Sequence, residues 1–340
     1  MKKRLLFLTA IGMTMAIAPA FADILGYVGT DGTPSAGQRR DYKRGSKFTM
    51  TGYGMTNSLC AMLDGRGGNT VNVQNWRVAV YNDSNGVPGS KLVESSNSVM
   101  GPNSSKYSTC IFSRAPLVPG NYWIVLHTGG KAGVIRYYTQ PDPNNWVGNN
   151  DLFDDGPSAS FGAIEGPADG TVSAFVEFDP TTEIAGRANV GANPSGALRA
   201  NFKRGSPIDV TKTGQVKAFT AYLDTLGGIT GTQDVRLALY RDAGGVPGQV
   251  VTDSIVQTMS SGRAGSWMTF PVPGPTPVTI TPGRYWIMIH TGDNAGVVRY
   301  YADGTGNWYG NADDFADGVS NPFGPGSAGD GRVSAAVIIQ

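Results

Sequence analysis

The chain is poor in residues that many enzymes and nucleic-acid-binding proteins need. Its 340 residues include only two histidines, and charged residues make up 16% of the total. Neither a G-x-S-x-G nor an H-E-x-x-H motif is present, and one histidine in each half cannot build a zinc site of several histidines. No long run of lysine and arginine offers a footprint for nucleic acid. These absences argue against common hydrolase designs, zinc peptidases and nucleic acid partners.

Long apolar runs are missing except at the N-terminus. There, Lys2, Lys3 and Arg4 precede the run LLFLTAIGMTMAIA, and AFA ends at Ala22. A charged start, a short apolar stretch and a small-residue cleavage site are typical of a secretory signal peptide. A retained membrane anchor is the alternative, although the run is short for a spanning helix. We therefore predict a signal peptide over residues 1–22 and a bacterial mature protein, secreted or at the cell surface, without a membrane span.

Helical patterns are absent as well. No stretch of a dozen residues combines a helical apolar stripe with caps, and the 48 glycines favour turns and short strands. In RYWIMIH, Tyr285, Ile287 and Ile289 alternate with residues that point to the opposite face. Turn sequences such as GGVPG and TPG separate runs of this kind. The pattern predicts an all-β fold made of antiparallel sheets.

The strongest positive feature is an internal duplication. KRGS occurs at residues 43–46 and again at 203–206. NWRVAVYNDSNGVPG matches DVRLALYRDAGGVPG, PGNYWIVLHTG matches PGRYWIMIHTG, and DLFDDG matches DDFADG. Each copy has about 150 residues, a typical domain size. We predict two tandem jelly-roll-like β-sandwich domains, residues 23–178 and 186–340, joined by a polar linker at 179–185.

The repeated strings LY-D-GG-PG, PG-YWI---TG, RYY and FADG…PFG carry a resemblance. With them the chain resembles tandem β-sandwich modules of secreted and cell-surface bacterial proteins, which often lie beside sorting anchors of the choice-of-anchor type. The resemblance covers nearly the whole mature chain and implies a sandwich fold outside the cytoplasm. It brings no catalytic residues with it. The chain has no recognisable anchor or enzyme domain, which departs from the usual setting of these modules.

The two cysteines, Cys60 and Cys110, both lie in strand-like segments of the first copy. An even number of cysteines in an exported protein indicates a disulfide, here between neighbouring strands. Two buried free thiols are the alternative. Thr220 stands where the first copy has Cys60, so the bridge is not shared by the two copies.

A cluster of acidic and amide residues recurs in both copies and forms the candidate metal site. Oxygen ligands on a Gly- and Asn-rich loop suit Ca²⁺, which takes six to eight of them. The spacing does not fit an EF-hand loop, and carboxylates that accept loop N–H groups are the alternative. A structural calcium ion is therefore a hypothesis for these residues: Asn149, Asp151, Asp154 and Asp155 in the first copy, and Asn311, Asp313, Asp314 and Asp317 in the second.

Tryptophan within an Asn- and Gly-rich segment suggests a platform for sugar rings, with nearby amides bonding to hydroxyls. The alternative is a lid on the sandwich core, since large aromatic side chains are well buried on average. A strand arginine precedes each Tyr-Tyr pair, and we expect it to pair with an aspartate of the following loop more often than with a ligand. The candidate ligand-binding residues are Trp146, Asn145 and Arg136 in the first copy, and Trp308, Tyr309, Asn307 and Arg299 in the second.

The two histidines, His127 and His290, occupy the same position of the repeat, at the end of a strand. A catalytic histidine needs a nucleophile or a metal with further ligands beside it. We expect each one to make a hydrogen bond at its strand end.

Three functions remain open from the sequence. The first is non-catalytic binding of an extracellular glycan or surface protein through the end loops, with avidity from two copies. The second is a structural subunit of an extracellular layer, filament or matrix, assembled as a homo-oligomer by strand addition at an edge strand at the C-terminus. The third is a carbohydrate-active hydrolase or lyase, which needs two carboxylates across a cleft.

Overall fold

The computed structural model describes residues 22–29, 32–105, 107–274, 278–292 and 294–340. The signal peptide predicted over residues 1–22 lies almost wholly outside the described residues. Over the described part of the chain the fold is all-β without helices, so no helix there is long and apolar enough to cross a membrane. This confirms the predicted fold class.

Strands of the first half form two antiparallel sheets, ordered β1-β15-β4-β11-β14 and β13-β12-β3-β10-β5-β6, with β2, β7, β8 and β9 on their margins. Strand β10 lies between β3 and β5, as in folds with Greek-key connections. The strands are β1 (Asp23–Gly26), β2 (Thr33–Pro34), β3 (Tyr42–Met50), β4 (Tyr53–Asp64), β5 (Gln74–Ser84), β6 (Val87–Glu94), β7 (Ser98–Met100), β8 (Tyr107–Phe112), β9 (Pro116–Leu117), β10 (Gly120–Gly130), β11 (Arg136–Gln140), β12 (Trp146–Asn150), β13 (Glu165–Ala168), β14 (Thr171–Val172) and β15 (Ala174–Thr181).

The second half repeats this plan with two differences. Its strand β27 is continuous where the first half has β13 and β14. Its strand β26 is continuous where the first half has β11 and β12, so it pairs with β19 in one layer and with β18 in the other. The strands are β16 (Glu183–Gly186), β17 (Asn193–Pro194), β18 (Phe202–Val210), β19 (Gly214–Asp224), β20 (Thr232–Asp242), β21 (Pro247–Asp253), β22 (Gln257–Ser260), β23 (Ser266–Pro271), β24 (Thr279–Ile280), β25 (Gly283–Thr291), β26 (Arg299–Ala312), β27 (Ser327–Val333) and β28 (Ala335–Ile339).

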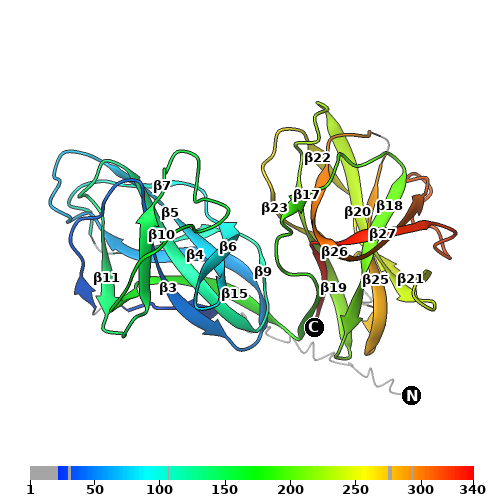
Figure 1. The fold of residues 1–340 in the computed structure, drawn as a ribbon, viewed down its shortest axis with the longest axis horizontal. Coiled ribbons are helices and arrows are strands. Elements are labelled where there is room, and N and C mark those ends of the chain that lie inside the picture. The colour runs from blue at the N-terminus through cyan, green and yellow to red at the C-terminus, as the bar shows by residue number, and fades with distance from the viewer. Residues whose placement is uncertain (1–21, 30–31, 106, 275–277, 293) are drawn as a thin grey trace, which may run out of the picture.

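The two halves stand side by side in Figure 1, and every pairing between the described strands joins strands of the same half. The predicted linker at 179–185 is largely strand: β15 runs to Thr181 and β16 starts at Glu183. Strand β16 pairs with β28 as β1 pairs with β15, so the segment is the first strand of the second half. Glu183 is buried and accepts hydrogen bonds from the main-chain N–H groups of Thr211 and Lys212.

The C-terminal strand is not an edge strand, contrary to the sequence prediction. Strand β28 lies between β16 and β19 and pairs with both. Its N–H and C=O groups are therefore used within the sheet, and strand addition has no free edge there.

Strands β20 and β25 are buried on both faces, one against the core between the sheets and the other beneath a covering segment. Val235, Leu237 and Leu239 pack in the core between the sheets together with Tyr285, Ile287 and Ile289, which confirms the predicted alternation. The opposite faces of β20 and β25 form a second apolar cluster with Phe323, from the segment that follows β26. The same arrangement recurs in the first half around Phe161. A long connection thus folds back over the outer face of one sheet in each half.

The predicted disulfide is present. Cys60 of β4 and Cys110 of β8 lie directly opposite each other, with their Cα atoms 4.1 Å apart. At the same position of the second half, Thr220 of β19 lies opposite Thr269 of β23. The bridge therefore replaces one cross-strand pair of the common fold, which is why the fold does not require it in both halves.

Candidate functional site

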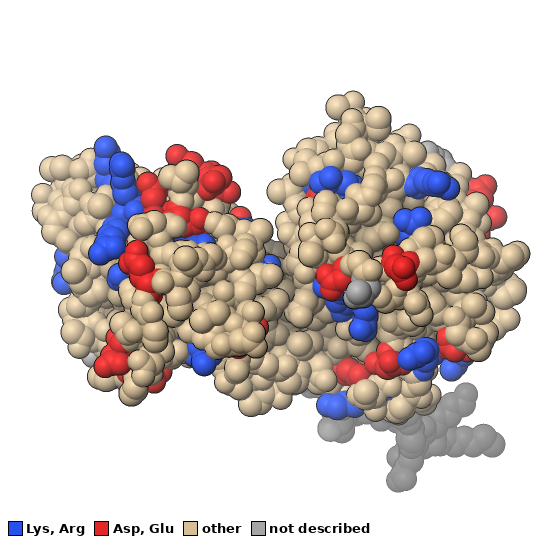
Figure 2. Space-filling model, viewed as in Figure 1, with Lys and Arg blue, Asp and Glu red and all other residues tan. Residues whose placement is uncertain are grey.

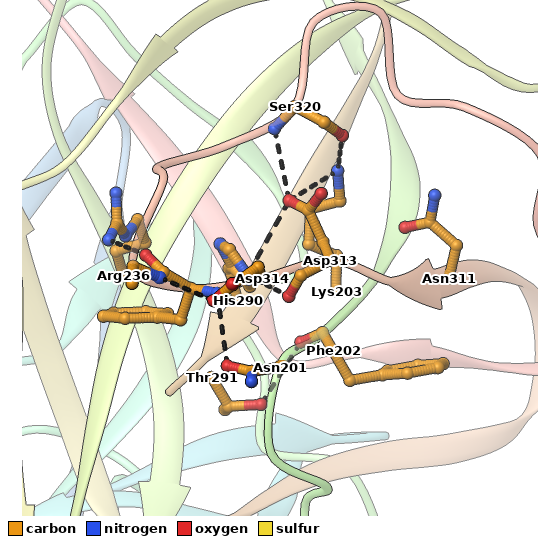
Figure 3. A network of polar contacts seen from close by, with 12 residues as sticks. Asn201, Phe202, Lys203, Arg236, His290, Thr291, Asn311, Asp313, Asp314 and Ser320 are labelled. Atoms are coloured by element: carbon orange, nitrogen blue, oxygen red, sulfur yellow. Dashed lines mark hydrogen bonds and ion pairs between the residues drawn. The ribbon is translucent and has the colours of Figure 1, made fainter. Parts of the chain in front are cut away.

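Each half contains a fully buried lysine beneath the connection that covers its outer sheet face. In the second half the ammonium group of Lys203 lies 2.9 Å from Asp313 Oδ2 and donates to Ser320 Oγ (Figure 3). In the first half, Lys43 lies 3.1 Å from Asp151 Oδ2 and donates to the main-chain oxygen of Phe161. The ion pair therefore fastens the covering segment to the strand beneath it.

Aromatic rings complete the surroundings of each lysine. The Lys203 ammonium lies 4.4 Å from the ring centroid of Phe323 and 5.4 Å from that of Tyr240. Burial lowers the pKa of Lys203 despite the attraction of Asp313. Burial alone would raise the pKa of Asp151, but hydrogen bonds from Ser158 and the contact with Lys43 outweigh it and leave that pKa below its usual value. The groups are arranged to hold a charge pair inside the protein.

The histidines belong to the same cluster. His290 is fully buried, and its Nε2 lies 3.1 Å from the main-chain oxygen of Asp313; His127 makes the equivalent contact with Asp151. Burial lowers the pKa of His290 to about 4 and also lowers that of His127. Each histidine is therefore neutral at pH 7 and makes the predicted hydrogen bond at its strand end.

The candidate calcium ligands do not converge in the structure. Asp151 and Asp313 are engaged by the lysines, while the side-chain amides of Asn149 and Asn311 donate to the main-chain oxygens of Phe161 and Phe323. Within the described residues, three groups drawn from histidine, cysteine, aspartate and glutamate gather closely only at Cys60, Cys110 and Glu177, where both sulfurs form the disulfide. The remaining candidates, Asp154, Asp155, Asp314 and Asp317, are exposed. Calcium binding stays a prediction without a preformed set of ligands.

The arginines before the Tyr-Tyr pairs form ion pairs, but with other aspartates than the sequence predicted. Arg136 and Asp64 form a two-pronged contact, with Nε and Nη2 at 2.9 and 2.8 Å from the carboxylate oxygens. Arg299 contacts Asp224 in the same way, at 2.9 and 2.7 Å. The acidic partner ends the adjacent strand, β4 or β19, so the register of strand pairing brings the two charges together.

The candidate tryptophans lie on strands and not in a loop as predicted. Trp146 is half-buried on β12 and packs against the core, with the Arg44 guanidinium 4.6 Å from its ring centroid. Trp308 is half-buried on β26, with Arg204 at 4.2 Å, and its indole ring lies against Gly329 of β27. Trp146 thus covers the core of the first half, the alternative left open by the sequence, whereas Trp308 is held between Arg204 and Gly329.

Most of the candidate binding residues beside the tryptophans also make contacts within the protein. Asn145 is used internally, since its Oδ1 accepts from the Lys47 N–H and its Nδ2 donates to Asp142. Tyr309 packs against Trp286 and Phe323. Asn307 is the exposed member of the set. Each member therefore offers less to an outside ligand than the sequence predicted, Asn307 excepted.

The repeated KRGS string carried a signal that the sequence analysis did not use. Its lysine is the buried ion-pair partner and its arginine stacks on the tryptophan. Its glycine allows close strand approach, since a Cβ at Gly205 would lie 1.7 Å from the Ile287 oxygen. Its serine Oγ accepts a hydrogen bond from the Val333 N–H. A lysine inside an identically repeated strand segment was the available hint of a buried charge.

The junction between the halves is the second candidate site. Met55 packs there with Ile184, Ala218 and Ile338, while Trp267 of β23 packs against the core of the first half. In Figure 1, β23 lies on the side of the second half that faces the first. The outer face of the β19–β23 pair is therefore covered by the other half of the chain.

A cavity of about 570 Å³ lies beside this contact. The first half contributes residues of β6, the segment from Phe112 to Arg114 and Asp155, and the second half contributes Tyr222 and the segment from Arg263 to Thr269. Burial raises the pKa of Tyr222 to about 12, so its hydroxyl group is neutral. The cavity thus combines aromatic surface with charged and hydroxyl groups.

No family model and no curated protein matches this chain. The resemblance to bacterial surface modules therefore stays a prediction. No residue role can be carried over from a relative, and the function has to be argued from the two sites.

Charged groups on the face drawn in Figure 2 occur in small clusters that contain both signs, between broad uncharged areas. The junction cavity likewise holds both signs of charge, with three basic and two acidic residues beside Phe112, Tyr222 and Trp267.

Proposed function

We propose that the mature chain is an exported, non-catalytic protein that binds polysaccharide or another component of the exterior of a bacterial cell. The observation that carries the proposal is the cavity between the halves. Its volume of about 570 Å³ lies within the range of small-ligand sites, roughly 300–1,000 Å³. Its lining combines aromatic side chains with hydrogen-bonding groups, the usual composition of a site for a polar ligand.

Its acidic groups support binding without catalysis. Hydrolysis of a glycosidic bond uses two carboxylates that face each other across a cleft. In the cavity, Glu94 is engaged by Lys91 at 2.5 Å, which leaves Asp155 as the one lining carboxylate without a partner among the described residues. The other candidate acids, Asp151 and Asp313, are held by the buried lysines. An enzymatic function finds less support here than a binding function.

The alternative of a structural subunit loses one of the features that suggested it, the free edge strand, because β28 is paired on both sides. The low charge and high glycine content of the chain still fit it. Assembly by other surfaces stays a hypothesis.

Binding of the full mature chain to insoluble and immobilised polysaccharides tests the proposal. Two exposed apolar residues give a matched pair of variants. Phe112, 76% exposed, lines the junction cavity, whereas Leu152, 66% exposed, does not. We expect Phe112→Ser to weaken binding and Leu152→Ser to leave it unchanged. A folded chain that binds no polysaccharide and no surface component would refute the proposed function.

A further inference from the structure

Each half holds a lysine ammonium group and a carboxylate in contact inside the protein. Lys203 Nζ lies 2.9 Å from Asp313 Oδ2, and Lys43 Nζ lies 3.1 Å from Asp151 Oδ2. Neither lysine side chain has any exposed surface, and the two aspartate side chains are only 10% and 12% exposed. The carbon Cγ is one bond beyond the oxygen that the lysine contacts. An amine and a carboxyl group held together in this way are the two reactants of amide formation.

Aromatic rings and the covering segment keep water away from each pair. The Lys203 ammonium lies 4.4 Å from the ring centroid of Phe323 and 5.4 Å from that of Tyr240, and the equivalent rings of the first half lie at 4.5 and 5.4 Å from its lysine. Amide formation releases water, so a site that excludes water protects the amide from hydrolysis. The reaction also removes two buried charges, which are costly to keep away from solvent.

A main-chain N–H group points at the same carboxylate oxygen in both halves. The Ser320 N–H donates to Asp313 Oδ2 at 3.2 Å, and the Ser158 N–H donates to Asp151 Oδ2 at 2.9 Å. Such a donor stabilises the negative charge that develops on a carboxyl oxygen under attack by an amine. The hydroxyl groups of the two serines also contact the pairs, at the ammonium in the second half (Figure 3) and at the carboxylate in the first. A hydroxyl both donates and accepts, so it can pass a proton between the reactants.

We propose that each buried pair is the site of an intramolecular amide bond, from Lys203 Nζ to Asp313 Cγ and from Lys43 Nζ to Asp151 Cγ. Two reactants held in contact reach effective concentrations of about 10⁵–10⁸ M in well-oriented cases. The bond fastens the covering segment of each half covalently to the strand beneath it, β18 or β3. This inference goes beyond the proposed binding function and does not depend on it.

The step needs no co-reactant, and the ion pair is its starting state. Because Lys43 and Ser158 hold Asp151 ionised, the proton that the carboxylate needs comes from the ammonium group, which becomes a neutral amine. The nitrogen lone pair then forms the Nζ–Cγ bond, a second Nζ proton passes to the acid hydroxyl group, and the Cγ–O bond breaks as water leaves. Burial lowers the pKa of both lysines, which favours the neutral amine.

The intact mass of the purified full chain tests the proposal, after reduction of the disulfide and determination of the N-terminus. We expect a mass below that of the sequence by two water molecules. Digestion with trypsin then locates the bonds, because a peptide that contains Lys203 should stay linked to one that contains Asp313. The pair of Lys91 and Glu94, whose side chains are 22% and 34% exposed, is the internal control and should stay unlinked.

Variants of the second half separate the two bonds. Asp313→Ala and Lys203→Met each remove one reactant, so the mass deficit should fall to one water molecule in either variant. Asp317→Ala changes an exposed residue of the same connection and should keep the deficit of two. The mass of the native chain tests the proposal even if a variant does not fold.

The outcomes are distinct in mass and in position. A native chain with the full mass of its sequence overturns the proposal, and so does a water deficit that maps to an Asp-Gly imide or that Lys203→Met leaves unchanged. Asn149 and Asn311 lie opposite the two lysines in the strand pairs, and a deficit of two ammonia molecules with links to these residues overturns aspartate as the acceptor. Two water molecules lost at the two pairs, one of them restored in Asp313→Ala, is the result that supports it.

Discussion

Removing the carboxylate of Asp313 should destabilise the second half severely. In the native structure this group lies 2.9 Å from the ammonium of Lys203, whose side chain has no exposed surface. The substitution Asp313→Ala leaves a buried positive charge whose remaining contacts in the described residues are two hydroxyl groups, Ser320 Oγ and Tyr240 OH, and two aromatic rings, and none of them carries a compensating negative charge. Breaking a buried pair by removal of one partner costs about 3–5 kcal/mol.

This loss of stability can be measured as a decrease in the melting temperature. For a unit of this size each kcal/mol shifts the midpoint by about 2–4 °C, so the expected decrease is about 10 °C. Circular dichroism or calorimetry on the full mature chain measures it. Asp317→Ala is the matched control, because Asp317 is exposed on the same connection, and its loss should cost less than about 0.5 kcal/mol.

A double substitution sharpens the test. In Lys203→Met with Asp313→Leu, both charges are replaced by apolar groups, so no charge is left without a partner. Such replacements are often neutral or stabilising, and the double variant should melt well above Asp313→Ala. Equal melting temperatures of Asp313→Ala and Asp317→Ala would refute the reasoning that a buried ion pair fastens the covering segment. So would a double variant whose loss of stability is the sum of the losses in Lys203→Met alone and Asp313→Leu alone.

Three further predictions follow from the same structure. The pKa of His290 is lowered from 6.5 to about 4, so between pH 6.5 and pH 4 the unfolded chain binds a proton that the folded chain does not. The free energy of unfolding should therefore fall by about 3 kcal/mol as the pH drops through this range. Urea unfolding at several pH values checks this, and His290→Gln should make the free energy of unfolding depend less on pH. Cys60→Ser with Cys110→Ser opens a bridge of sequence separation 50 and should cost about 4 kcal/mol in chemical denaturation, whereas an unchanged midpoint would contradict the bridge. Gly205→Ala places a Cβ 1.7 Å from a main-chain oxygen of β25, so it should reduce the free energy of unfolding by about 3 kcal/mol and lower both the melting temperature and the soluble yield. Gly304→Ala, whose Cβ would have no atom within 4 Å, should behave like the native chain.

The sequence and the structure agree where the evidence is local. Alternation of apolar residues predicts the inner faces of β20 and β25, because side chains on a strand point to opposite faces whatever the rest of the chain does. The duplication predicts that the second half repeats the first, and two cysteines in strand-like segments predict the bridge between Cys60 and Cys110. These features depend on spacing along the chain.

The errors concern groups whose partners lie far away in the chain. Arg136 pairs with Asp64, which is 72 residues distant, whereas the predicted partner was an aspartate from the nearby loop. Register between β4 and β11 decides this contact, and the pattern of apolar residues does not reveal register across a long connection. Trp308 was expected in a loop because its neighbours are Asn and Gly; it lies on β26, where the strand partner Gly329 leaves room for the indole.

By itself, the sequence determined an all-β chain with two similar halves, a cross-strand disulfide and the alternation of its core strands, because these follow from periodicity and repetition. Tertiary structure alone decided that Lys203 is buried, that the covering segments hide a second face of each sandwich, and that Trp267 meets the other half at a cavity. Those outcomes depend on the packing of segments distant in the chain, where the free energy of burial and the need to satisfy each buried charge act between residues that no local pattern connects.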